Sequence, residues 1–273
     1  MDRNETLSPK EIADALGQVA TVKGSARIRD QFFLAILAGI YIGFGGIVSI
    51  MVTSESAMDD GLKRFIGGSA FSVGLMLVLI PGSELFTGNI LMTVGLLSKR
   101  LHFLRVLRNW AVVWIGNFAG AILLAWVMKN TDLMGATGAP NAVGDRAIAI
   151  ADAKLQLAFW PCLLRGVLCN MLVCLAVIMA CSSRSVSGKI LGIYFPIMAF
   201  VACGFEHSIA NMYFLPAGLM AAGRFGGRFW EMFGNLIPVT LGNIIGGLAL
   251  IFLHPGSQKM VSRLFRTAKQ PQA

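Results

Sequence analysis

Charged side chains are scarce in this chain. They make up 14% of its 273 residues, whereas a soluble domain of this size carries about 25%. Hydrophobic residues reach 56%, and several uncharged runs approach the roughly 20 residues that cross a bilayer core. Apolar and polar positions do not alternate along these runs, which argues against a transmembrane β-barrel. The composition therefore predicts an all-α membrane protein with several spans.

Motifs of hydrolytic enzymes are also missing. The sequence contains neither Gly-x-Ser-x-Gly nor His-Glu-x-x-His. An intramembrane enzyme that used Ser83 or Thr87 as nucleophile and His207 as base would still need an orienting group and an oxyanion hole. Nothing in the sequence supplies them, so we expect no enzymatic activity.

Cysteine is sparse, and its placement indicates no cofactor. Four of the five cysteines lie on one apolar run, which favours small core residues over disulfides or metal ligands. We therefore expect no metal and no other cofactor. No signal-peptide pattern is visible, because the first apolar run starts at Phe32, after a mixed-charge segment.

The net charge of +9 comes from basic residues at span ends and in loops. This placement favours contact with anionic lipid and excludes nucleic acid as the expected partner. Fifteen Lys and Arg residues fall on the side of the two termini and seven on the other. The positive-inside rule therefore predicts a multi-pass protein of the inner (plasma) membrane with both termini in the cytoplasm.

The N-terminal segment, residues 1–30, is predicted to form an amphipathic helix. Ser8 and Glu11 match a capping box, Pro9 suits the first helical position, and apolar residues recur at helical spacing. The helix could lie on the membrane or a neighbouring subunit, or it could plug the cytoplasmic mouth. We assign residues 31–255 to a channel domain and residues 256–273 to a basic cytoplasmic tail.

The channel domain is predicted to contain six spans, two of which are interrupted. The spans cover residues 31–54, 63–98, 107–129, 155–181, 189–222 and 232–253. The second and fifth are too long for single straight helices and contain glycine- or proline-rich interruptions. Irregular backbone at membrane depth survives only where protein or a watery cavity covers it. Both breaks therefore point to a transport pathway.

The two breaks share a motif. Residues 82–89, GSELFTGN, match residues 204–211, GFEHSIAN, at Gly, Glu and Asn with an offset of 122. The spans that follow match as well, GNFAG at 116–120 with GNIIG at 242–246. Three spans per half place the halves in opposite orientations, so the pattern predicts an inverted repeat with its site near the midplane.

Buried carboxylates in these breaks need partners. We expect Glu84 and Glu206 to accept hydrogen bonds from backbone N–H groups that the breaks leave free. The glutamates, with Asn89 and Asn211 of the same motif, would then pin the loops rather than touch substrate, since a carboxylate repels an anion.

At these residues the chain resembles the formate/nitrite transporter family. GSELFTGN and GFEHSIANM are similar to that family's loops in the second and fifth helices. CNMLVCLAV (169–177) and NLIPVTLGNIIGG (235–247) resemble its fourth and sixth helices. The resemblance implies a homopentamer with one pore per protomer and an aquaporin-like helix arrangement. The paired Asn-Pro-Ala motif of aquaporins themselves is absent.

The resemblance also implies site residues. His207 would be the central pore histidine, which fits the cost of burying such a group in a membrane without a use. Lys154 would be a basic residue of the periplasmic vestibule, where it would gather anions. The remaining positions implied for the pore are Asn170 beside the histidine, Thr87, Leu85 and Phe86 in the cytoplasmic slit, and Phe71, Leu75 and Phe200 at a second constriction.

The expected function is passage of small monovalent weak-acid anions, namely formate, nitrite or hydrosulfide, linked to protons through His207. A proton-coupled carrier of short carboxylates with alternating access is the alternative. The resemblance also bears on Arg165: nitrite-type members carry a basic residue at this position and formate-type members an apolar one, so the chain is similar to the nitrite type here. Arg165 could instead pair with a neighbouring protomer, and both readings stay open.

Overall fold

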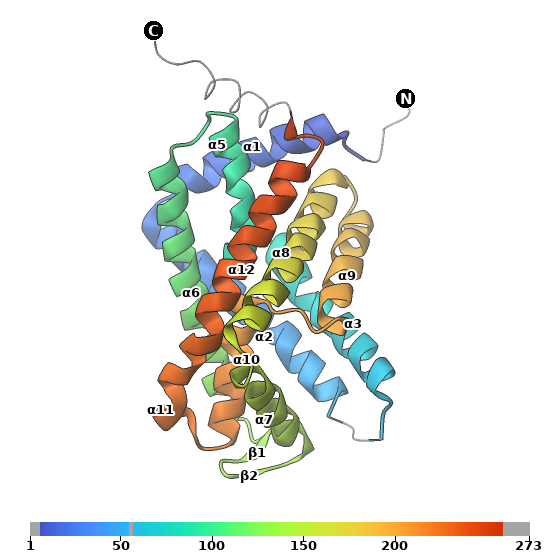
Figure 1. Cartoon of the computed structure of the whole chain (residues 1–273), viewed down its shortest axis with the longest axis vertical. Helices are drawn as coiled ribbons and strands as arrows, with labels where there is room; N and C mark the ends of the chain where they lie inside the picture. The colour runs from blue at the N-terminus through green and yellow to red at the C-terminus, as the bar shows by residue number, and fades with distance from the viewer. Residues whose placement is uncertain (1–5, 55–56, 259–273) are drawn as a thin grey trace.

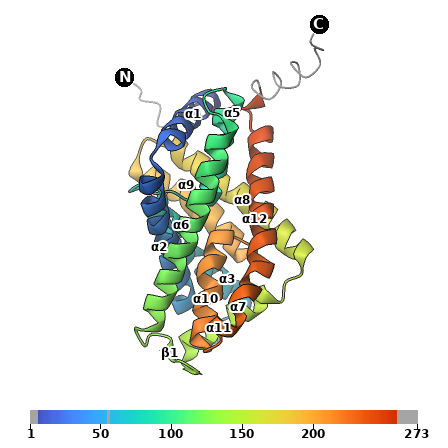
Figure 2. The same ribbon diagram turned by 90° about the vertical axis from the view of Figure 1, so that its left-hand side faces the viewer.

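The computed structural model describes residues 6–54 and 57–258. They form an elongated bundle of helices with α1 (Pro9–Ser25) lying across one end, beside α5 (Figures 1 and 2). The Ser8 hydroxyl accepts from the Glu11 N–H, and the Glu11 carboxylate accepts in return from the Ser8 N–H. The predicted capping box is therefore present at the start of α1.

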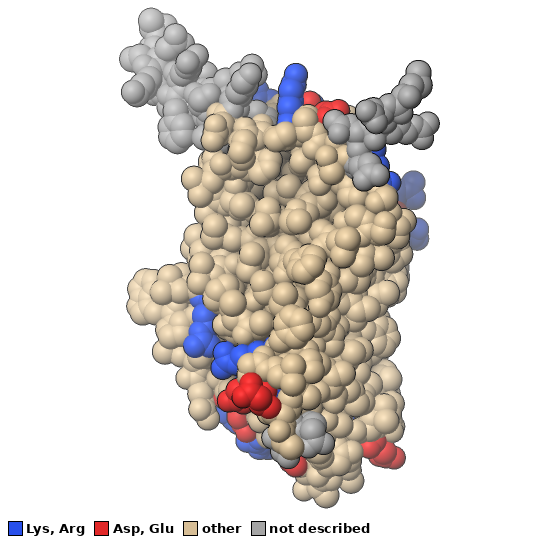
Figure 3. Space-filling view, turned by 90° about the vertical axis from the view of Figure 1, so that its right-hand side faces the viewer, with Lys and Arg blue, Asp and Glu red and all other residues tan. Residues whose placement is uncertain are grey.

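Within the described residues, five helical stretches are long and apolar enough to cross a membrane. Each presents large apolar side chains on the outside of the bundle, such as Ile115, Trp126 and Leu241. Figure 3 shows a broad band without charged side chains between the two ends of the molecule on that face. The five stretches are α2 (Ile28–Val52), α3 (Asp60–Leu79), α6 (Phe103–Lys129), α8 (Phe159–Ser182) and Phe225–Leu253, which joins α11 (Phe225–Arg228), η2 (Phe229–Glu231) and α12 (Met232–Leu253).

Two further helical pairs are interrupted. After α3 the chain resumes as α4 (Phe86–Asn89), η1 (Ile90–Met92) and α5 (Thr93–Leu97), and α9 (Val186–Ala202) is followed by α10 (Ser208–Ala221). Gly82 and Gly204 have φ of 93° and 72°, a conformation that favours glycine. From these breaks α5 runs to the end covered by α1, and α10 runs towards the opposite end (Figure 1).

The segment between α6 and α8 contains a helix that the sequence reading missed. A short hairpin, β1 (Gly135–Ala136) and β2 (Ala139–Pro140), leads into α7 (Ala142–Leu155). The Asn141 side chain caps α7 by accepting from Val143 and Gly144. The fourth span accordingly starts at Phe159, after α7, and not at residue 155. The helix was overlooked because α7 is neither long nor strongly apolar.

Glycines bring the long helices into backbone contact. A Cβ on Gly120 of α6 would clash with the Ile36 carbonyl of α2, and one on Gly246 of α12 would clash with the Val167 carbonyl of α8. Such close approach through small residues is the usual way in which membrane helices pack. It fixes α2 against α6 and α8 against α12 in the same manner.

Candidate functional site

The two breaks meet at His207 and Thr87. The Nε2 atom of His207 lies 2.9 Å from the Thr87 hydroxyl, and both side chains are buried. His207 is also the N-cap of α10, because its Nδ1 accepts the Ala210 N–H at 3.0 Å. An imidazole that accepts at Nδ1 carries its proton on Nε2, so the neutral ring donates to Thr87.

Aromatic rings surround the histidine on one side. Phe200 stacks on His207 with centroids 5.7 Å apart, and Phe71 packs edge-on against Phe200 at 5.8 Å. Leu75 lies one helical turn beyond Phe71 and is also buried. The structure thus brings together the three apolar residues predicted for the constriction. Phe214, stacked on Phe71 at 6.0 Å, completes the group and was missed.

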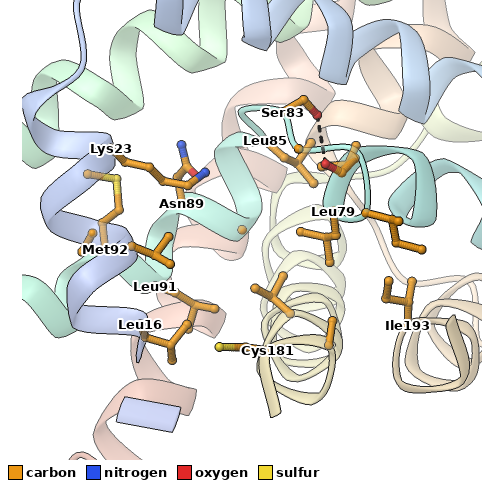
Figure 4. Close-up of a pocket in the computed structure, with 18 of the residues that line it drawn as sticks. Leu16, Lys23, Leu79, Ser83, Leu85, Asn89, Leu91, Met92, Cys181 and Ile193 are labelled. Atoms are coloured by element: carbon orange, nitrogen blue, oxygen red, sulfur yellow. Dashed lines mark hydrogen bonds between the residues drawn. The ribbon is translucent and has the colours of Figure 1, made fainter. Parts of the chain in front are cut away.

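A cavity lies on each side of this group. The α1 cavity, of about 290 Å³, is lined by α1, α3, α4, η1, α8, α9 and the break before α4. Figure 4 shows Leu16 and Lys23 of α1 facing Leu79 and Ile193 across it. The α7 cavity, of about 160 Å³, is lined by α2, α3, α7, α9, α10 and the break that contains His207.

Glu84 is held by side chains, not by the backbone N–H groups that we expected. Its carboxylate accepts from Asn89 at 2.6 Å and from Asn109 at 3.2 Å, and it lies 3.1 Å from the Lys23 ammonium. Lys23 also donates to the Asn89 amide oxygen. The first break is therefore tied directly to α1.

Glu206 has the same surroundings in the second break. Asn211 donates to its carboxylate at 2.6 Å, and Asn211 in turn contacts Asn235. The Lys154 ammonium binds both carboxylate oxygens, at 2.9 and 3.0 Å. Lys154 lines the α7 cavity, and its charge is matched by Glu206.

The free backbone groups of each break bind a second asparagine, distinct from the one that holds the glutamate. Asn117 donates to the carbonyls of Ala35 and Glu84 and accepts the Phe86 N–H. Asn243 repeats this pattern with Gly166, Glu206 and Ser208. These are the asparagines of the duplicated GNxxG motif, so the sequence contained the signal, but we had assigned the task to the glutamates.

Asn170 supports Thr87 rather than the histidine ring. Its amide donates to the Thr87 carbonyl at 3.3 Å and to the Asn243 carbonyl at 2.6 Å. Its buried Oδ1 has no hydrogen-bond partner within residues 6–54 and 57–258. The residue is thus adjacent to the His207–Thr87 pair and has one acceptor free.

Leu85 and Phe86 point to different surroundings. Leu85 lines the α1 cavity, where Figure 4 shows it beside Ser83. Phe86 is equally buried but packs edge-on against Trp110, with centroids 6.3 Å apart. Arg165 is exposed on α8, and its carbonyl accepts the Glu206 N–H. Of these three side chains, Leu85 lines the α1 cavity, and none of them lines the α7 cavity.

Two cations escaped the sequence reading. Lys23 lies within the segment predicted to be an amphipathic helix, and it forms an ion pair with Glu84 of the first break. Arg146 lies on α7, which was not expected to be a helix, and lines the α7 cavity. No local motif marks either residue, because their partners, Glu84 for Lys23 and Thr53 for Arg146, lie far away in the sequence.

Long apolar helices, two interrupted helical pairs and a buried polar pair between two cavities define a multi-pass membrane transport protein. The family model described as "Formate/nitrite transporter" matches residues 10–255. The chain belongs to the formate/nitrite transporter family. This membership places it among transporters and channels and not among enzymes.

Individual relatives agree with this assignment. The chain is 42% identical over 265 residues to a probable formate transporter of Methanothermobacter thermautotrophicus, covering 89% of this chain and 94% of that one. It is 34% identical over 268 residues to the formate channel FocA of Escherichia coli (strain K12), covering 91% and 93%.

Solved structures share the fold. A pentameric formate channel with formate bound matches with a TM-score of 0.72 and 35% identity, over 88% of this chain and 98% of that one. An ion channel of the FNT family matches with a TM-score of 0.79 and 25% identity, over 96% and 99%.

Proposed function

We propose that this protein is a channel for small monovalent weak-acid anions, with formate, nitrite and hydrosulfide as the substrate class. The observation that carries the proposal is the buried His207–Thr87 pair between the α1 and α7 cavities. The formate channels among its relatives support the same class. A permeating anion would travel from one cavity to the other past this pair.

The apolar walls set the barrier. Phe71, Leu75 and Phe200 on one side, and Leu85 on the other, offer no hydrogen bonds to replace the hydration shell of an anion. Desolvation disfavours the charged form, which raises the pKa of a weak acid in transit. Entry into this region therefore favours protonation of the substrate, and the neutral acid crosses more easily.

His207 and Thr87 provide the polar contacts within the barrier. The Nε2–H of His207 and the Thr87 hydroxyl can both turn to an anion at the price of their mutual hydrogen bond. Uptake of a proton at Nδ1 gives an imidazolium, which can hand its Nε2 proton to the anion and return to a neutral ring. That uptake displaces the Ala210 N–H, so the proton step is coupled to the start of α10.

The duplicated motifs and the two matching helix breaks also bear on the overall architecture. We propose six crossings arranged as an inverted 3+3 repeat in an aquaporin-like arrangement, with the interrupted pairs as the second and fifth crossings. Residues 1–30 would form the cytoplasmic segment, 31–255 the channel domain and 256–273 the cytoplasmic tail, of which 259–273 lie outside the described residues. The pentameric relative supports a homopentamer in which every protomer has its own pore.

Flux measurements in liposomes test the function. The purified protein is reconstituted, and uptake of formate, nitrite, hydrosulfide, acetate and chloride is followed together with internal pH. We expect fast flux of the weak acids with acidification of the liposome interior, and exclusion of chloride. A protein that moves none of the weak acids would contradict the proposal, and strict one-for-one proton exchange at carrier-like rates would favour alternating access.

A further inference from the structure

The α7 cavity contains four cations that differ in their partners. Lys154 is neutralised by two contacts with Glu206. Lys63 and Arg64 are on the first turn of α3, where Asp59 and Asp60 are their neighbours in sequence. Arg146 reaches the cavity from α7. In Figure 3 basic and acidic side chains lie together in the lower part of the face, below the uncharged band.

The guanidinium of Arg146 is anchored through one nitrogen. Its Nε donates to the Thr53 hydroxyl at 3.1 Å, and that hydroxyl donates its own proton to the Ser49 carbonyl at 2.7 Å. Thr53 is buried, so its oxygen is a fixed acceptor. This contact holds the plane of the guanidinium while the two terminal nitrogens are left for another partner.

No carboxylate lies within ion-pair distance of Arg146 among residues 6–54 and 57–258. Its terminal nitrogens also make no hydrogen bond within this part of the chain. Arg146 is therefore a half-buried cation that feels the charge of Asp60 but forms no ion pair like the one between Lys154 and Glu206.

We propose that Arg146 is an entry site for planar anions with two oxygens, and that it makes the channel prefer formate and nitrite over hydrosulfide. The inference rests on the proposed function and narrows its substrate class. A guanidinium presents parallel N–H donors that match the two oxygens of a carboxylate or nitrite. Hydrosulfide has a single acceptor atom and gains only the attraction between charges.

The position suits a first binding step. Arg146 and His207 line the same cavity, so an anion held at the guanidinium has already left bulk water before it meets the histidine. A cation that forms no ion pair and lies on the low-dielectric wall of a cavity also raises the local concentration of anions. The parallel N–H donors of the guanidinium then add a preference for anions with two oxygens to this general attraction.

The test compares concentration dependence for formate and hydrosulfide in liposomes. For Arg146→Gln we expect the half-saturating formate concentration to rise about tenfold, as befits the loss of charge-assisted hydrogen bonds, and hydrosulfide flux to change much less. Arg146→Lys keeps the positive charge but removes the parallel N–H donors, so it should also lose the preference for formate. Lys129→Gln, which removes a charge outside both cavities, is the control and should match wild type.

Several outcomes would overturn the proposal. Equal effects of Arg146→Gln on formate and hydrosulfide would reduce Arg146 to a general attracting charge, and no effect on either would remove it from the pathway. Tighter formate binding in Asp60→Asn would show that this carboxylate, and not an anion, is the main partner of the guanidinium.

Folding is controlled separately. Each variant is checked for assembly by size-exclusion chromatography, and Thr53→Val, which releases the Nε anchor, gives a second route to the same loss of preference. Wild-type protein without flux of any weak acid would refute the proposed function itself, and this result is distinct from an altered preference.

Discussion

The two helix breaks use the same framework but differ in what they add to it. Glu84 and Glu206 each pair with a lysine and with the asparagine five residues later. The next position is Leu85 in the first break and His207 in the second. Leu85 caps α4 without any side-chain hydrogen bond, whereas His207 caps α10 through Nδ1.

This difference separates positions that hold the two breaks in place from positions that the proposed pathway uses. Asn117 and Asn243 recur because an interrupted helix leaves buried backbone groups that need partners in both halves. Glu, Lys and the second asparagine recur as a cluster in which the buried side chains satisfy one another. Leucine and histidine do not recur, because the two ends of a pathway need different side chains. His207 of one break then meets Thr87 of the other.

The largest effect is expected from breaking the framework in either half. Asn243→Ala and Asn117→Ala each remove three hydrogen bonds to buried backbone groups. Each group left without a partner costs about 1–3 kcal/mol, so we expect both variants to lose stable assembly. Fluorescence-detected size exclusion after heating measures this, with exposed Asn130→Ala as the control. If only one of the two variants were affected, the halves would not share a framework.

A second prediction concerns the residue that distinguishes the second break. Asparagine is a good N-cap, so His207→Asn should keep α10 and the oligomer. It cannot exchange a proton, so we expect proton-linked uptake to fall about 100-fold or more, with at most a passive leak. Uptake and internal pH are followed between about pH 5 and pH 8, where an imidazole normally titrates.

The control is His102→Asn, at the exposed N-cap of α6, which should behave as wild type. A well-folded His207→Asn protein with an unchanged pH profile would leave His207 with a packing role only.

Much of this comparison could be read from the sequence. The duplicated Gly-Glu-Asn and Gly-Asn-Gly motifs indicated both breaks, because interruptions within apolar runs stand out. The partners of the glutamates could not be read in the same way. Lys23 and Lys154 approach them from α1 and α7, at distances along the chain that no local pattern encodes.

Side-chain direction was a further limit. Leu85 and Phe86 are neighbours with similar chemistry, so no local pattern assigns them different surroundings. Their separation follows from the start of α4, where successive side chains diverge around the helix axis and only one of them faces the α1 cavity. A role at the slit was predicted for both, and the structure supports a cavity position for Leu85.

A third prediction uses this separation. Leu85→Ala should widen the α1 cavity and raise the flux of acetate relative to formate a few-fold, since a smaller apolar side chain lowers the dehydration barrier. Phe86→Ala should instead destabilise the protein by about 3–5 kcal/mol, because it leaves a void beside Trp110. Flux of acetate relative to formate and melting in detergent distinguish the two. Equal changes of selectivity in both variants would place Phe86 in the slit as well.

The smallest effect is expected at Glu11, at the start of α1. Hydrogen bonds from the Ser8 hydroxyl and the Ser8 N–H lower the pKa of this exposed carboxyl below its usual value. A lowered pKa means that the stabilisation of the cap is complete above the usual pKa of glutamate and is lost only as the pH falls through the lowered value. Both values lie below about pH 5, so the cap stays constant over the range in which His207 is tested.

Glu11→Gln should therefore leave the pH profile of transport unchanged between about pH 5 and pH 8, in contrast with His207→Asn. Because the glutamine still accepts from Ser8 without a charge, amide exchange in the first turn of α1 should quicken no more than a few-fold at neutral pH, and that difference should disappear in acid. Hydrogen exchange of wild type and variant at matched pH measures this. A Glu11→Gln protein with a flattened transport profile would move the pH response from the buried histidine to α1, and the contrast between the two breaks would no longer explain it.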